Sequence, residues 1–251
     1  KKKTELKREV LENGITLIAA SNHHVPLVSV KLSCLAGLRY ETKENNGINN
    51  LIASVLTKGT KRRNSLQIAQ DMEAIGGSIK GGAGRNSLFV HMDVFSRNLE
   101  KGFEIFADSI FDSIFDTEIL EREKHSILHD IKSQEDNLPA VAFKLFSKTM
   151  FKSHPFGMPL LGTKKSLGAI DRTVVLDYYH NMINPKNAVL TVVGDIDIEK
   201  SIASVKTLFD RPNRGEDIVV PHFAEPDIKS PRLSETIKEK KQAHLVIGFK
   251  S

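Results

Sequence analysis

The sequence predicts an α+β fold in which helices pack on one face of a mainly antiparallel sheet. Segments with two-residue alternation, typical of strands, are interspersed with runs of apolar residues at helical spacing. Strand pairs mixed with helical runs in this way favour a sheet layer covered by a helix layer. The length of 251 residues is sufficient for the buried core of one large domain or two modest ones.

The first predicted elements are strands over 15–19 and 26–32, with an Asn-Gly turn before the first of them. A helix over about 46–58 ends at Gly59, because glycine readily adopts the conformation that terminates a helix. The other predicted elements are helices over 64–75, 97–111, 117–134, 138–151, 174–182 and 198–208, and strands over 87–94 and 188–195. Residues 210–242 carry several prolines and many charges, which indicates a linker, and a further strand begins at Ala243.

Composition excludes two classes of function. The net charge of +5 comes from scattered lysines, and the chain has no Trp and no basic stripe that alternates with stacking aromatics, which argues against nucleic-acid binding. No run of 18 apolar residues is present, so the sequence predicts no membrane span. Cys34 is the only cysteine, which excludes an internal disulfide, and its apolar strand predicts a buried structural thiol.

The most informative motif is Asn50-Leu51-Ile52-Ala53-Ser54, which has the spacing of the inverted zinc-peptidase motif His-x-x-Glu-His without its ligands. Flanking segments at 37–41, 45–49 and 56–60 complete a frame that resembles the insulinase/pitrilysin family, in particular mitochondrial processing peptidases and their bacterial relatives. Further landmarks are Pro155-x-Gly157, Leu161-Gly162 and Pro185-x-Asn187 followed by the strand ending in Gly194-Asp195.

The resemblance implies a domain organisation and an α+β processing-peptidase fold. Residues 1–209 would form an N-terminal domain, 210–242 the linker, and 243–251 the start of a second, similarly folded domain. Both ends of the sequence look cut, so a leader or a further domain is an open expectation.

Three motif positions decide the expected chemistry. At about 100° per residue, Asn50, Ala53 and Ser54 fall on one stripe of the helix, opposite an apolar arc. An amide is a poor zinc ligand, alanine offers no proton acceptor, and a serine hydroxyl stays protonated at neutral pH. Outside the family frame the same stripe is the solvated face of an amphipathic helix. Both interpretations predict that no metal is bound there.

Two acidic residues on a later helix match the acidic pair of the family. Ser54 and Asp130 are separated by 75 residues, the spacing at which the family places its third ligand, a Glu, and Glu123 lies two turns before Asp130. One carboxylate without imidazole neighbours will not retain zinc. We therefore predict no catalytic residue, no metal and no cofactor at the eroded positions Asn50, Ala53, Ser54, Glu123 and Asp130.

Other candidate residues receive simpler interpretations. His125 and His129 are one helical turn apart but point about 100–160° away from the acidic pair, so exposed histidines are expected. His23-His24 is expected in a turn. The resemblance places an edge strand for extended peptide at Lys80-Gly81, where the family has Asn-Ala, and the glycines there weaken the strand.

These observations favour a non-catalytic member of the family. It would pair with a zinc-bearing homologous subunit and help to enclose a chamber for extended peptides. Two alternatives are a metalloendopeptidase whose ligands lie outside this segment and a purely structural subunit, like the respiratory-complex core proteins that share the fold.

Overall fold

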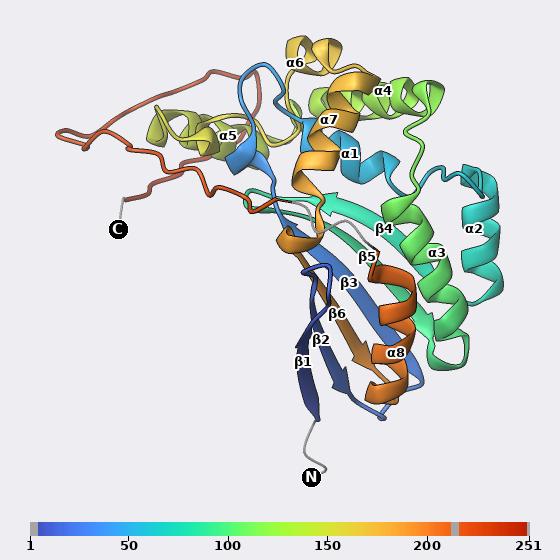
Figure 1. Ribbon diagram of the computed structural model, residues 1–251. Helices are drawn as coiled ribbons and strands as arrows, with labels where there is room; N and C mark the ends of the chain where they lie inside the picture. Colours follow the sequence, from blue (N-terminus) through green and yellow to red (C-terminus); the bar gives the residue numbers. More distant parts are fainter. Residues whose placement is uncertain (1–4, 212–215, 250–251) are drawn as a thin grey trace.

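A computed structural model describes residues 5–211 and 216–249. Within these ranges one sheet has the strand order β1-β2-β6-β3-β5-β4, and every neighbouring pair is antiparallel except the parallel pair β2 and β6 (Figure 1). The strands are β1 Leu6–Val10, β2 Thr16–Ser21, β3 Leu27–Leu35, β4 Ser78–Ala83, β5 Ser87–Phe95 and β6 Ala188–Gly194. The predicted mainly antiparallel sheet is confirmed.

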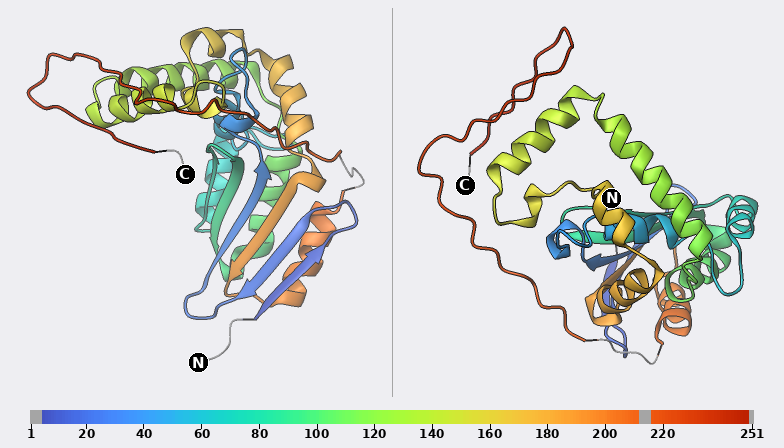
Figure 2. Two further views of the ribbon diagram at one scale, coloured as in Figure 1. Left: turned by 90° about the vertical axis from the view of Figure 1, so that its left-hand side faces the viewer. Right: turned by 90° about the horizontal axis from the view of Figure 1, so that it is seen from above.

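Most of the helices cover one side of this sheet, whereas the helix at Leu138–Met150 projects away from it (Figures 1 and 2). Alternate side chains of β3, from Val28 to Cys34, are buried beneath them, while the intervening ones are partly exposed on the open face. The helices are α1 Ile48–Val55, α2 Ser65–Ala74, α3 Leu99–Phe111, α4 Thr117–Gln134, α5 Leu138–Met150, α6 Lys164–Ala169, α7 Arg172–Met182 and α8 Ile198–Phe209. The predicted α+β layer arrangement is therefore confirmed.

Three elements were not predicted from periodicity. Strand β1 carries three successive charged residues and gains its strand identity from pairing with β2. Strand β4 contains two glycines and is defined by its ladder with β5. Helix α6 is a short turn of helix whose first residues are fixed by a capping box between Thr163 and Ser166.

The region predicted as a linker has no helix or strand in its described parts, 210–211 and 216–242. Residues 243–249, predicted as a strand, likewise form no strand with any of the described residues. A strand is defined by hydrogen bonds to a neighbour, so an alternating sequence alone does not produce one. The strand and the domain boundary around it remain predictions.

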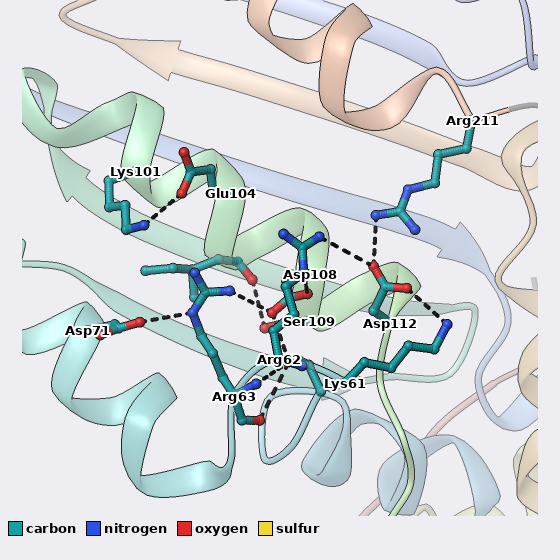
Figure 3. A network of polar contacts seen from close by, with 12 residues as sticks. Lys61, Arg62, Arg63, Asp71, Lys101, Glu104, Asp108, Ser109, Asp112 and Arg211 are labelled. Atoms are coloured by element: carbon teal, nitrogen blue, oxygen red, sulfur yellow. Dashed lines mark hydrogen bonds and ion pairs between the residues drawn. The ribbon is translucent and has the colours of Figure 1, made fainter.

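A buried ion-pair network fixes the loop between α1 and α2 onto α3 (Figure 3). Asp108 of α3 is fully buried and accepts hydrogen bonds from Thr60 Oγ1 at 2.8 Å and Arg63 Nη1 at 2.6 Å, with Arg62 Nε at 3.2 Å. Asp112, one turn later, pairs with Arg211 beyond α8. The network thus joins the loop after α1 to α3 and to the residues that follow α8.

Two simpler predictions concern Cys34 and membrane insertion. Cys34 is buried in β3, and burial raises the pKa of its thiol to about 12, as expected for a structural cysteine. No helix within 5–211 or 216–249 has both the length and the apolar character required to cross a bilayer.

Candidate functional site

The motif helix α1 is positioned by a buried carboxylate at its N-terminus. Glu41 is 4% exposed. Its Oε2 accepts from Asn46 Nδ2 and the Gly47 backbone N–H, both at 2.8 Å, and its Oε1 accepts from the backbone N–H and side-chain amide of Asn49. Acceptors are favourable here because the first N–H groups of a helix lack intrahelical partners.

A second set of contacts ties α1 to the loop that precedes α6. Asn46 Nδ2 also donates to the Pro159 carbonyl at 3.0 Å, and the backbone of Gly47 packs directly on Leu161 and Gly162. At Gly47 a Cβ would lie 2.6 Å from the Leu161 oxygen, so only glycine fits there. The landmarks read from the sequence on either side of the motif therefore meet in space.

Asn50, the first eroded position, takes part in the same set of contacts. Its Nδ2 donates to the Leu160 carbonyl at 2.7 Å. The side chain is half-buried, and its hydrogen bond connects α1 to the 159–162 loop. The position that carries a zinc ligand in the family frame makes a structural hydrogen bond here.

Ala53, the second eroded position, is 2% exposed and faces β4. The approach is close: a Cβ on Gly81 would lie 1.9 Å from the Ala53 carbonyl oxygen and 3.1 Å from its Cα. The interpretation of Asn50, Ala53 and Ser54 as a solvated helix face is therefore wrong for Ala53, because the edge strand covers it. Periodicity indicated only that the stripe faces away from the apolar arc.

Ser54 and Glu123 are the next two motif positions, and they belong to α1 and α4, which are in contact. Ser54 Oγ donates to the Leu51 carbonyl at 2.8 Å, within its own helix. Glu123 of α4 is buried, and its Oε1 lies 2.6 Å from the Nζ of Lys58, which follows α1. The half-buried ammonium of Lys58 thus neutralises the Glu123 carboxylate.

Asp130 differs from Glu123, although both were predicted on one face of the helix. Asp130 is exposed near the end of α4, whereas Glu123 lies under α1. Where another element crosses a helix, it covers only part of that helix, so two residues on one stripe can have different environments.

The histidine predictions are also tested by the structure. His125 and His129 are exposed as predicted, and His125 Nδ1 lies 2.8 Å from the Glu121 carbonyl. His23 and His24 lie in the predicted turn between β2 and β3.

The donor set of this site does not fit zinc. The Asn50 amide and the Ser54 hydroxyl are weak ligands already engaged with backbone carbonyls, and Ala53 supplies no base. Glu123 is paired with Lys58. In the described residues, no group of three or more His, Cys, Asp or Glu side chains could hold a metal ion. We derive no metal-dependent step from these residues.

Sequence reasoning overlooked the two residues that organise the site, Glu41 and Lys58. Glu41 belonged to the family frame, and its place several residues before the helix was a signal for an N-terminal acceptor. Lys58 carried no local signal, because its partner Glu123 is far away in the sequence.

Two known protein-family descriptions match parts of this chain. Residues 16–164 match the family described as insulinase, peptidase family M16, and residues 169–251 match the description peptidase M16 inactive domain. The chain belongs to the insulinase family of peptidases, M16. The two matched ranges contribute to one sheet, since β6 lies between β2 and β3. The resemblance read from the sequence is thereby confirmed.

Relatives of this M16 chain include proteins named as zinc proteases. An "uncharacterized zinc protease" of Rickettsia felis is 32% identical over 82% of the chain and 50% of that protein. The uncharacterized zinc protease YmxG of Bacillus subtilis is 28% identical over 98% of the chain and 59% of its own length. The mouse mitochondrial-processing peptidase subunit beta is 30% identical over 74% of the chain and 38% of its length.

Solved structures support the fold. A protease from Helicobacter pylori has a TM-score of 0.82 at 18% identity, covering 89% of this chain and 55% of that one. The peptidase M16 inactive domain from Pseudomonas fluorescens has a TM-score of 0.81 at 20% identity, covering 88% of this chain and 54% of that one. The chain thus spans about half the length of the relatives it matches.

Proposed function

We propose that this chain is a non-catalytic M16 subunit that pairs with a zinc-bearing homologue and helps to form a peptide-binding chamber. The observation that carries the proposal is the reuse of the motif positions. Asn50 holds the 159–162 loop, Ala53 packs under β4, and Glu123 is neutralised by Lys58. Side chains engaged in packing and ion pairs support the fold and leave no base or ligand for hydrolysis.

Pairing is supported by the family. One relative is the beta subunit of mitochondrial-processing peptidase, and its name shows that it works as one subunit among others. A subunit that has lost its own zinc ligands would contribute chamber wall and stability to an active partner. The unmatched half of the relatives would extend the same wall.

The peptide-binding part of the proposal rests on β4. This strand is the edge of the sheet next to β5, so its outer backbone groups face away from the ladder, as β-augmentation requires. Lys80 and Gly81 lie in its centre beside α1. Gly81 permits the close approach to Ala53, and the exposed Lys80 is free of that packing. An extended peptide would add to this edge through main-chain hydrogen bonds.

Elemental analysis of the purified protein tests the loss of the zinc site. We expect far less than about one zinc per chain and no cleavage of an unstructured peptide. The comparison variant carries Asn50→His and Ser54→His, which places two imidazoles one helical turn apart on α1 without a base. It should bind more zinc than the unmodified protein while remaining unable to hydrolyse peptide, because position 53 is still alanine. Zinc near one equivalent in the unmodified protein, with chelator-sensitive cleavage, would instead establish the active-metalloendopeptidase alternative.

Affinity purification of the native protein tests the pairing. A zinc-bearing M16 homologue should co-purify in a stable complex, and the complex should cleave peptide while the isolated chain does not. Isolation of the chain in an assembly without any such homologue would favour the purely structural alternative and refute the paired-peptidase proposal.

A further inference from the structure

The described segment 216–249 runs beside α5 and away from the sheet (Figures 1 and 2). It has no helix or strand, so no backbone ladder holds it in place. Its large apolar side chains are mostly on the surface: Leu233, Ile237 and Leu245 are 87%, 91% and 81% exposed. Apolar burial therefore contributes little to its position, and polar contacts must supply the rest.

One carboxylate of this segment is bound by three consecutive backbone amides. Glu225 Oε1 accepts from the N–H of Lys152 at 2.6 Å, and Oε2 accepts from those of Ser153 at 2.8 Å and His154 at 2.9 Å. The Glu225 side chain is only 10% exposed. Successive N–H groups of this kind form a concave site for an anion, and charge-assisted hydrogen bonds are stronger than neutral ones.

A guanidinium seven residues later binds the complementary groups of the same helix end. Arg232 Nη1 donates to the carbonyls of Met150 at 2.8 Å and Thr149 at 3.3 Å, and lies 3.7 Å from Glu225 Oε1. The last carbonyls of a helix lack intrahelical partners. Glu225 therefore satisfies the amides after α5, while Arg232 satisfies the carbonyls within its last turn.

The end of α5 and the loop after it, which bind Glu225 and Arg232, are in turn held by residues next to the sheet. Arg85, in the turn between β4 and β5, donates to Ser147 Oγ of α5 at 3.3 Å and lies over the Phe156 ring. Arg39, after β3, donates to the Pro221 carbonyl at 3.1 Å. The Phe223 ring packs edge-on against His154, with ring centroids 4.8 Å apart.

We infer that Glu225 and Arg232 form a latch that docks segment 216–249 on the end of α5. The latch fixes the path by which the chain leaves the first domain toward residues 243–249. It lies in the segment predicted as a linker and holds that segment against α5.

Hydrogen exchange measured by mass spectrometry on the intact protein tests the latch. In a Glu225→Ala variant, the amides of residues 152–154 should exchange about tenfold faster or more, because each loses a charge-assisted acceptor. Peptides from 216–249 should become more rapidly exchanging at the same time. The matched control is Glu235→Ala, which removes the same charge from an exposed position of the same segment and should leave both regions unchanged.

Two further variants keep the test decisive if Glu225→Ala does not fold by far-UV circular dichroism. Glu225→Gln retains the size of the side chain and should give a smaller acceleration at 152–154, and Arg232→Met should accelerate exchange in 216–249. Wild-type exchange in both regions for the folded Glu225 and Arg232 variants would overturn the inference. Equal acceleration in Glu235→Ala would overturn it as well, since the effect would then reflect net charge alone.

Discussion

Replacing Glu41 with glutamine should strongly destabilise the protein, because this carboxylate holds the N-terminus of the motif helix. Each oxygen accepts two hydrogen bonds, one pair from Asn46 and Gly47 and the other pair from Asn49. A glutamine amide retains only one acceptor oxygen and turns its NH₂ group toward the remaining donors. Two charge-assisted bonds at about 1.5–3 kcal/mol each give an expected loss of about 3–6 kcal/mol.

Urea denaturation followed by far-UV circular dichroism measures this loss directly. Even the lower bound of about 3 kcal/mol corresponds to a fall in Tm of roughly 6–12 °C for a chain of this size. The control is Glu44→Gln, an exposed carboxylate on the same loop, which should leave the denaturation midpoint nearly unchanged. If Glu41→Gln costs less than about 1 kcal/mol, the buried carboxylate is not what positions α1, and the reasoning fails.

Three further predictions concern other parts of the molecule. Gly81→Ala should lower the free energy of unfolding by about 1–3 kcal/mol in urea titrations, because its Cβ meets the Ala53 carbonyl, and an unchanged midpoint would show that α1 and β4 separate freely. Asp108→Ala should cost about 1–3 kcal/mol by the same measurement, since it removes the buried acceptor of Thr60 and Arg63, and a loss below about 1 kcal/mol would contradict this. Burial and the neighbouring Arg39 lower the pKa of His154, partly opposed by a nearby carboxylate. The unfolded chain therefore takes up the proton first, and stability should fall as pH drops below about 6.5, less so in His154→Gln; equal pH dependence of both proteins would refute the assignment.

The latch also changes how the middle of the chain is understood. Prolines and charges in 210–242 predicted a linker, and the described part indeed contains no regular element. Composition indicates only that such a segment is unsuited to form a helix or strand by itself. It does not report that Glu225 meets three amides that follow a helix more than 70 residues earlier.

The sequence by itself determined the fold class, most of the helices and strands, and the family. These features depend on local periodicity, turn residues and motif spacing, all of which can be read along the chain. It also determined that Asn50, Ala53 and Ser54 lack the chemistry of zinc ligands, because that follows from residue type alone.

Tertiary structure decided what those positions do instead. Ala53 is covered by β4 because Gly81 approaches it closely. Glu123 of α4 is neutralised because Lys58, which follows α1, lies beside it. β1 and β4 likewise became strands only through their neighbours. Pairing, close approach and burial are relations between segments distant in sequence, and their energies arise only when the chain brings those segments together.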